Sequence, residues 1–307
     1  MELRLFLFSL ESSILFGKNL QFHFFFTSVI FLILVLLQKF GLSALGARRW
    51  LVLGPINFQP SELVKFTVAL YLAKVASNNK STLSYLIPLA LVAFLIMMQP
   101  DLGTTLVIMV IGFSQVFVSN VNLLHIFGSM GLGLIATTLL ILFSPYRKAR
   151  LMTFIQGTSD PLGNSYHVRQ ILLGLGSGGI FGVGFGASRQ KFLFLPEAST
   201  DSIFAVIAEE LGLIGAFIII FLFAFFLMRG LKIAKNSPDI FASVLATGIT
   251  AWIGGQAFLN IASMVSLVPL TGIPLPFISY GGSSLVMVLS ACGILLNISK
   301  FTTHDQK

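Results

Sequence analysis

Acidic and basic side chains gather between Ser188 and Gly215, where a loop runs into a long apolar stretch. They are Arg189, Lys191, Glu197, Asp201, Glu209 and Glu210. Ionisable groups at the mouth and inside a membrane helix are costly, so they indicate a functional site with partners. Asp201 follows a proline-containing loop and is expected to open a helix, whose backbone N–H groups and dipole favour a carboxylate there. Such a carboxylate could accept a proton as a general base, or it could simply cap the helix.

The composition indicates a polytopic membrane protein. Hydrophobic residues make up 56% and charged residues 10% of the chain, and the mean hydropathy is +0.94. Soluble domains carry about 25% charged residues. The net charge of +8 does not indicate nucleic acid, because the charges lie between apolar spans and not in a basic run with interleaved aromatics. The single cysteine, Cys292, excludes an internal disulfide framework and a cysteine-based metal site.

Eight apolar stretches predict full transmembrane helices, the form that satisfies backbone groups inside a bilayer. The expected spans are about 21–38, 61–76, 83–98, 102–119, 121–143, 201–228, 240–268 and 281–298. Residues 1–16 are apolar but short and contain Glu11, so they are interpreted as an N-terminal remnant of a membrane segment. Residues 144–200 form one long connection, which predicts a large folded functional loop. The expected fold is therefore all-α, with a single membrane domain over residues 1–307.

The basic residues of the short loops predict the orientation. They fall on one side if the spans alternate, and the positive-inside bias assigns that side to the cytoplasm. These residues are Lys74, Lys80, Arg229, Lys232, Lys235, Lys300 and Lys307. The long loop and the loops at 39–60 and 268–280 then face outward. Their cations are either solvated loop charges or donors for an anionic ligand, and guanidinium groups suit a diphosphate.

Seven motifs occur in order along the chain. They are GARRWLVLG (46–54), FQPSELVK (58–65), QPDLGTT (99–105), DPLGNSYHVRQ (160–170), the segment 176–201, AEELG (208–212) and PLTGIPLPFISYGGSS (269–284). These motifs resemble the RodA/FtsW/SpoVE family, also called SEDS proteins, and the wording SRQKF and PLPFISYGGSS is closer to the FtsW and SpoVE branch. The resemblance covers the chain from about residue 41 to its end. Family members have ten transmembrane helices, so the first one and a half are expected to be missing here.

The resemblance implies a peptidoglycan glycosyltransferase that polymerises lipid II into glycan strands at the outer face of the bacterial cytoplasmic membrane, during cell division or cell-shape maintenance. It implies as partners lipid II, the growing lipid-linked strand, a class B penicillin-binding transpeptidase, and divisome or elongasome proteins. Two positions depart from the family pattern around Asp201. Ser199 stands where members usually carry His or another polar or basic residue, and Ser202 replaces an aromatic residue.

This chemistry needs a base for the acceptor hydroxyl and positive charge near the departing diphosphate. Asp201 is the expected base. The candidates for substrate binding are Arg48, Arg49, Arg150, Lys191 and Glu197. No spacing demands a protein metal site, and no cofactor is certain, although Mg2+ or Mn2+ could share the diphosphate with Asp201 or Glu197 as ligand. Glu197 could equally be a loop residue paired with an arginine.

Four charged residues inside the spans are candidates for structural or coupling roles. Glu62 and Lys65 lie three residues apart on one helix face and are expected to form an ion pair, which could also link ligand or partner binding to helix position. At least one of Glu209 and Glu210 should face the bundle interior and find a donor. Asp101 is expected to cap a helix or to pair with an outer basic residue. The glycines of 174–186 predict tight turns and close backbone contact, because the segment lacks the context of a phosphate-binding loop.

Two alternatives to the enzyme stay open at this stage. A transporter that flips lipid-linked precursors would also use intramembrane charges and an outer basic cleft. A catalytically silent scaffold for a class B penicillin-binding protein would fit the missing N-terminal helices and Ser199.

Overall fold

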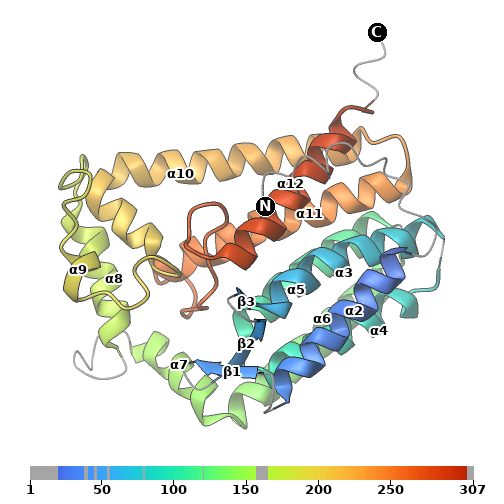
Figure 1. Ribbon diagram of the computed structural model, residues 1–307, viewed down its shortest axis with the longest axis horizontal. Coiled ribbons are helices and arrows are strands. Elements are labelled where there is room, and N and C mark those ends of the chain that lie inside the picture. The colour runs from blue at the N-terminus through green and yellow to red at the C-terminus, as the bar shows by residue number, and fades with distance from the viewer. Residues whose placement is uncertain are drawn as a thin grey trace. The chain divides into compact units, whose positions relative to one another are not determined.

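The structure is a computed structural model that describes residues 20–37, 41–44, 47–53, 56–78, 80–119, 121–156 and 165–302. Helices dominate this part of the chain (Figure 1). In order, the elements are α2 (Leu20–Leu36), β1 (Gly41–Ala44), β2 (Ala47–Leu53), β3 (Ile56–Phe58), α3 (Pro60–Ser77), α4 (Leu83–Met98), α5 (Leu102–Val118), α6 (Leu123–Leu142), α7 (Pro145–Gln156), α8 (Tyr166–Ser177), α9 (Gln190–Leu193), α10 (Ile203–Lys235), α11 (Ile240–Met264) and α12 (Gly282–Ser299). The expected N-terminal remnant at 1–16 lies outside the described residues.

Each of the eight expected spans is a helix, which confirms the all-α membrane fold. Among the described helices, α6, α10, α11 and α12 are long and apolar enough to cross a membrane. Helices α2, α4 and α5 are apolar but have only 16 or 17 residues. Helix α3 has 18 residues and carries Glu62, Lys65 and Lys74, which lower its hydropathy. The chain is therefore a multi-pass membrane protein.

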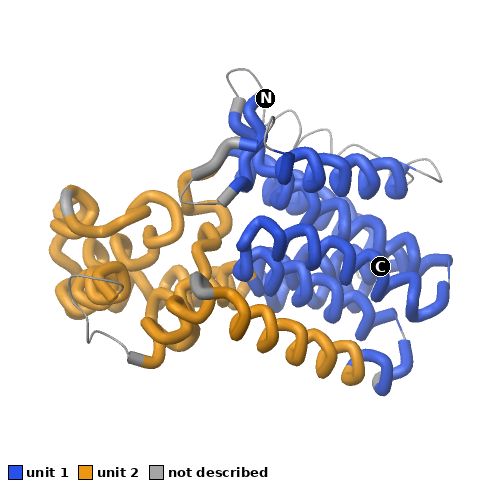
Figure 2. The backbone as a smooth tube through the Cα atoms, turned by 90° about the horizontal axis from the view of Figure 1, so that it is seen from below, with its two compact units in different colours: residues 1–126, 226–255, 282–307 blue, residues 127–225, 256–281 orange. Residues whose placement is uncertain are grey.

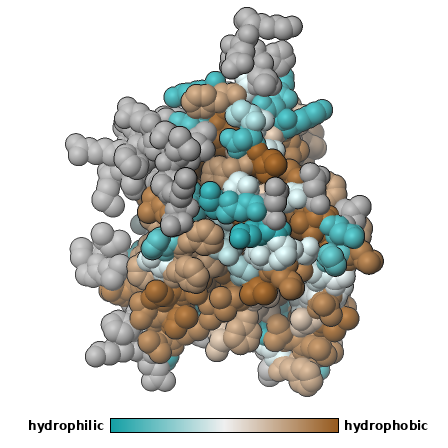
Figure 3. Space-filling model, turned by 90° about the vertical axis from the view of Figure 1, so that its right-hand side faces the viewer, coloured by the Kyte–Doolittle hydropathy of each residue, from teal (hydrophilic) through white to brown (hydrophobic). Residues whose placement is uncertain are grey.

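Large hydrophobic side chains remain exposed along these spans. Phe94, Phe117 and Phe217 are each more than half exposed. The face at the right of Figure 1 shows hydrophobic residues over its lower part and hydrophilic residues across its middle (Figure 3). Such extensive apolar exposure indicates contact with lipid, because soluble monomers rarely expose large contiguous apolar patches.

Two compact units divide the chain (Figure 2). Unit 1 comprises residues 1–126, 226–255 and 282–307, and unit 2 comprises residues 127–225 and 256–281. Helices α6, α10 and α11 contribute residues to both units.

The core of unit 1 combines apolar packing with buried hydrogen bonds between helices. Trp252 and Tyr85 are among its largest buried side chains. Gln115 of α5 donates through Nε2 to the backbone oxygens of Ala69 in α3 and Val244 in α11, at 2.8 and 3.1 Å. Buried amides in a membrane bundle need such partners, and they hold α3, α5 and α11 together.

The loop expected at 39–60 contains instead a three-stranded antiparallel sheet in unit 1, in the order β1–β2–β3. Ala44 of β1 pairs with Ala47 of β2, and Leu51 of β2 pairs with Phe58 of β3. Strand β2 reads ARRWLVL, whose aromatic and branched residues favour extended backbone. Apolar length alone does not predict this strand, because it has only seven residues and two of them are arginines.

The long connection at 144–200 belongs to unit 2, and α7, α8 and α9 fold within it, so the prediction of a folded loop is confirmed. Its core includes Phe204 at the start of α10, Ile171 of α8, and Leu195 and Leu275 from two loops. These contacts position the residues just before α10.

Candidate active site

Asp201 lies in a turn immediately before α10, not in the helix itself. Helix α10 begins at Ile203, so the expected span starting at residue 201 is too early by two residues. Pro196 follows α9, and the backbone then folds around Glu197, whose φ is +50°. The amides of Thr200 and Ser202 donate to the Glu197 carbonyl at 3.2 and 3.1 Å. The turn therefore presents Asp201, which is half-buried, at the mouth of α10.

Three successive carbonyls of this turn are held by residues that lie 59 to 81 positions further along the chain. The Tyr280 amide donates to Ser199 O at 2.9 Å, and Ser279 Oγ donates to Thr200 O at 2.5 Å. Asn260 Nδ2 donates to Asp201 O and also to Ile273 O, both at 2.8 Å. The backbone under Asp201 is thereby fixed to the end of α11 and to the loop 265–281. A carboxylate on so restrained a backbone is preorganised, as a catalytic group requires.

Gly272 of this loop lies against the Asp201 carboxylate. A Cβ added to Gly272 would stand 3.3 Å from Asp201 Oδ2, and Gly272 has a φ of +69°. Both the close approach and the left-handed backbone favour glycine at this position. Beside it, Thr271 Oγ1 is buried and makes no hydrogen bond within the described residues.

His167 and Arg150 belong to the same part of unit 2. His167 Nε2 lies 2.9 Å from Ser202 Oγ, next to Asp201 in sequence. Arg150 of α7 donates through Nη1 to Leu270 O at 3.2 Å, on the loop that carries Gly272. Burial, reinforced by the positive charge of Arg150, lowers the pKa of His167 below its usual range. The sequence does not single out His167, because the four histidines are scattered along the chain and their spacing indicates no shared site.

The acidic pair of α10 binds residues 188–191, which include the start of α9. Glu209 accepts from Ser188 Oγ at 2.5 Å and from the amides of Arg189 and Gln190 at 3.1 and 3.4 Å. Glu210 pairs with Lys191 Nζ at 2.6 Å. Both carboxylates are buried and both have donors, so the expectation that at least one would find a donor is confirmed. Lys191 is therefore engaged with Glu210, and its contact with a diphosphate stays a prediction.

Helix α10 is broken beside this network, where the glycine-rich loop contacts it. At Gly212 the backbone has a φ of 67° and a ψ of −166°, far from helical values. Val183 N donates to Glu209 O at 3.0 Å, and Leu213 N donates to Gly179 O at 2.9 Å. Loop backbone thus replaces the lost helical partners, as irregular backbone at membrane depth requires. A Cβ at Gly182 would clash with Glu210 O, which confirms the prediction of close backbone contact.

Unit 1 contains Arg48 and Arg49, the remaining residues predicted to bind substrate, and Asp101. Arg49 of β2 donates to Gln99 O at 3.2 Å and to Pro100 O at 2.6 Å, and its Nε lies 3.9 Å from Asp101 Oδ2. Asp101 caps α5, since its Oδ1 accepts from Thr104 N at 3.0 Å. Both expectations for Asp101, a cap and a basic partner, are confirmed. Arg48 pairs with Ser43 of β1, and Arg49 lies next to it at the irregularity where the β1–β2 register shifts.

The expected ion pair of α3 is also present in unit 1. Lys65 Nζ lies 2.8 Å from Glu62 Oε1, and both side chains are buried. The Lys65 ammonium also lies 5.3 Å from the ring centroid of Trp252 in α11. Glu62 Oε2 makes no hydrogen bond within the described residues. A coupling role for this pair, or for Glu209 and Glu210, stays a prediction.

The acidic residues near Asp201 limit how a metal could bind. Across the described residues, His, Cys, Asp and Glu form no group of three that could hold an ion. Asp201 and Glu197 belong to one turn, and Glu197 is exposed, with its Oε2 2.6 Å from Thr200 Oγ1. Mg2+ often binds through one or two carboxylates together with substrate phosphates. These residues fit a cation shared with a bound diphosphate better than one held by the protein alone.

The sequence model for the FtsW/RodA/SpoVE family, described as cell cycle protein, matches residues 1–304. Stage V sporulation protein E of Bacillus subtilis is 42% identical over 282 residues, which are 89% of this chain and 77% of the relative. A probable peptidoglycan glycosyltransferase FtsW of Legionella pneumophila is 41% identical over 281 residues, which are 88% of this chain and 71% of the relative.

Two solved structures share the fold. A chain from a structure described as a peptidoglycan synthase complex aligns with a TM-score of 0.79 and 28% identity, over 99% of this chain and 88% of that one. The rod shape determining protein RodA of Thermus thermophilus aligns with a TM-score of 0.71 and 28% identity, over 99% and 85%. The higher identity to FtsW and SpoVE relatives confirms the expected closeness to that branch. The chain belongs to the FtsW/RodA/SpoVE family.

Proposed function

We propose that this protein is a peptidoglycan glycosyltransferase that polymerises lipid II into glycan strands at the outer face of the bacterial cytoplasmic membrane. The FtsW relatives, which carry the description of probable peptidoglycan glycosyltransferase, support the activity. The observation that carries the site is the Asp201 turn, in which three successive carbonyls accept hydrogen bonds from Tyr280, Ser279 and Asn260. Lipid II and the growing lipid-linked strand are the proposed substrates.

In the proposed reaction, the acceptor hydroxyl oxygen bonds to the anomeric carbon of the donor sugar while the bond from that carbon to the lipid diphosphate breaks. Asp201 takes the hydroxyl proton, and cationic side chains stabilise the negative charge on the departing diphosphate. Arg150 is the proposed contact in unit 2, because its guanidinium binds Leu270 O on the loop that also places Gly272 at Asp201. Arg48, Arg49, Lys191 and Glu197 remain the other proposed substrate contacts. A divalent cation, when bound, would supply further charge neutralisation at the diphosphate.

A class B penicillin-binding transpeptidase is the proposed partner. The structural relative described as a peptidoglycan synthase complex supports an assembly of this type. Divisome or elongasome proteins would then determine whether the activity serves division or cell shape.

The test is polymerisation of labelled lipid II by the purified full chain with its partner transpeptidase. Asp201→Asn keeps the size and polarity of the side chain but removes the base, so we expect glycan product to fall by at least about 100-fold. Asp239→Asn is the matched control: Asp239 accepts from the Ala242 amide at 2.7 Å at the start of α11, and asparagine caps helices equally well.

Four outcomes discriminate among the functions. Product from wild type and Asp239→Asn but not from Asp201→Asn supports the enzyme and its base. Equal product from Asp201→Asn removes the base assignment. Absence of polymer from the wild type, with translocation of labelled precursor in vesicles, would indicate the transporter, and absence of both would indicate the scaffold.

A further inference from the structure

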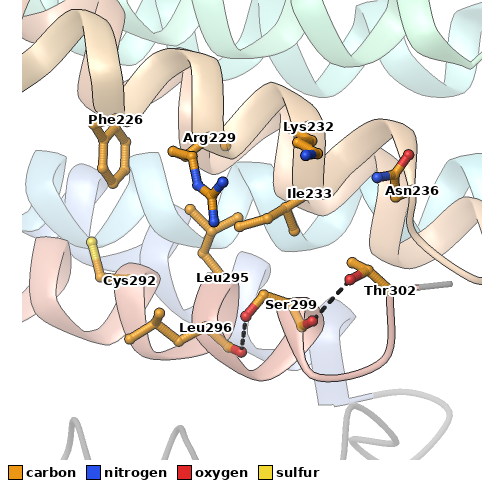
Figure 4. A pocket seen from close by; sticks show the side chains of 11 residues that line it. Phe226, Arg229, Lys232, Ile233, Asn236, Cys292, Leu295, Leu296, Ser299 and Thr302 are labelled. Carbon is orange, nitrogen blue, oxygen red and sulfur yellow. Dashed lines mark hydrogen bonds between the residues drawn. The ribbon is translucent and has the colours of Figure 1, made fainter. Parts of the chain in front are cut away.

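A pocket of about 490 Å³ lies in unit 1 between the last turns of α10 and α12 (Figure 4). Its polar side chains are Arg229, Lys232, Asn236, Ser299 and Thr302, and its apolar side chains are Phe226, Ile233, Cys292, Leu295 and Leu296. Phe226 and Cys292 form the apolar end, away from Asn236 and Thr302 (Figure 4). Ligand pockets typically enclose about 300–1,000 Å³, so this one is large enough for a headgroup and the adjoining part of an acyl chain.

The two cations of this pocket are available to a ligand. Within the described residues, neither Arg229 nor Lys232 forms a side-chain ion pair or hydrogen bond. The hydroxyls of the opposite wall are already used, because Ser299 Oγ donates to Leu296 O at 2.7 Å and Thr302 Oγ1 donates to Ser299 O at 3.0 Å (Figure 4). Because their protons are engaged, these two hydroxyls can only accept hydrogen bonds from a ligand. The positive charge of the pocket comes from Arg229 and Lys232 of α10.

The pocket lies at the basic end of the unit 1 helices. The carboxyl ends of α3, α10 and α12 point to the same side, at the right of Figure 1. Lys74 and Lys235 lie in the last turns of α3 and α10, and Lys300 follows α12. The positive-inside bias predicts that this end faces the cytoplasm. Cations here would stand at the level of the lipid phosphates of the inner leaflet.

The apolar side chains of the pocket favour a lipid phosphate over a soluble phosphate as its ligand. Leu296 of α12 lines the pocket and is exposed, and Met228 and Leu231 expose further apolar surface on the same turns of α10. A soluble phosphate would leave this apolar surface bare, whereas the acyl chains of a lipid would cover it. Basic pockets between transmembrane helices on the cytoplasmic side suit phosphate-bearing lipid headgroups.

We propose that this pocket binds an anionic glycerophospholipid of the inner leaflet, with its phosphate between Arg229 and Lys232 and an acyl chain over Cys292 and Leu296. Neither a role in catalysis nor a contact with the Asp201 turn is required. The site would join the cytoplasmic ends of α10 and α12 through a bound lipid.

The experiment measures lipid binding to the purified full chain by native mass spectrometry in mild detergent. The probes are dioleoyl phosphatidylglycerol, dioleoyl phosphatidylcholine and water-soluble glycerol 3-phosphate. We expect wild type to bind phosphatidylglycerol in preference to the other two. Each cation near an anionic headgroup contributes about five-fold, so the double variant Arg229→Gln/Lys232→Gln should bind phosphatidylglycerol about 25-fold more weakly.

Lys235→Gln is the matched control, because it removes an exposed cation from the same helix end without altering the pocket lining. Its affinity for phosphatidylglycerol should change by less than about two-fold. A second variant, Cys292→Phe, fills the apolar end while leaving both cations, and it should also reduce lipid binding. If the double variant aggregates, the two single variants are each expected to show the five-fold loss.

Three results would overturn the proposal. One is equal binding of phosphatidylglycerol by wild type and by the pocket variants. Another is equal binding of phosphatidylcholine, which carries no net charge. The third is glycerol 3-phosphate binding as tightly as the lipid, which would indicate an ion site only. None of these measurements requires polymerase activity, so failure here and failure of the proposed enzyme function are separate outcomes.

Discussion

Gly272→Ala tests whether the loop 265–281 determines the position of the Asp201 carboxylate. The new methyl group would stand 3.3 Å from Asp201 Oδ2, so the carboxylate must move by a few tenths of an ångström. Misplacement by about 1 Å can cost 100-fold in rate, so this smaller shift should lower kcat about five-fold. Alanine at a φ of +69° also costs about 1–2 kcal/mol of stability.

Gly186→Ala separates the two effects. Gly186 has a φ of +82°, but a Cβ there would meet no atom within 4 Å. This variant should therefore lose a similar stability of about 1–2 kcal/mol while retaining the wild-type rate per folded molecule.

The assay compares polymerisation of labelled lipid II with thermal unfolding in detergent for wild type and both variants. Rates are normalised to the folded fraction, so a difference between the variants reports on the carboxylate. Equal losses of rate in the two alanine variants, or a wild-type rate in Gly272→Ala, would refute the claim that the loop positions Asp201.

Three further predictions concern the same unit. Asn260→Ala removes the two 2.8 Å hydrogen bonds to Asp201 O and Ile273 O, so thermal unfolding should show a loss of about 2–3 kcal/mol together with reduced polymerisation. Burial and Arg150 lower the pKa of His167, so the folded state binds fewer protons than the unfolded state, and stability should fall as the pH drops below about 6.5. His167→Gln should lessen that fall between about pH 8 and pH 5 in thermal unfolding, and an unchanged pH dependence would contradict the assignment. Lys191→Ala leaves Glu210 without its 2.6 Å partner and should lower the free energy of unfolding by about 1–3 kcal/mol. This loss is smaller than for a fully buried pair, because Lys191 is partly exposed. The double variant Lys191→Ala/Glu210→Ala should recover part of the lost stability.

The membrane helices and several local pairs were predictable from sequence because their causes are local. Apolar length identifies a span, and a carboxylate at the start of a helix indicates a cap, as observed for Asp101. The spacing of Glu62 and Lys65 places them on one helix face, where they form the expected pair. The close backbone contact of the glycine-rich segment was also predictable, because the loop can approach α10 closely only without a side chain at Gly182.

The parts that were missed depend on contacts between distant segments. Ser279 and Tyr280 hold the Asp201 turn from about 80 residues away, and no periodicity records such a pairing. The partnership of His167 with Ser202 likewise joins two elements 35 residues apart. The start of α10 was placed too early because the turn residues before it are polar and compatible with a helix cap.

The two departures from the family pattern affect the site differently. Ser199 is exposed, and its carbonyl, not its side chain, accepts the Tyr280 amide, so the residue type at this position leaves the turn geometry unchanged. Ser202 is fully buried, and its hydroxyl lies 2.9 Å from His167 Nε2. An aromatic ring at 202 could not make this contact in the same space, so Ser202 and His167 form one structural unit. Ser202 therefore has a hydrogen-bond partner in His167, and the Asp201 turn is held separately, by Asn260 and Ser279.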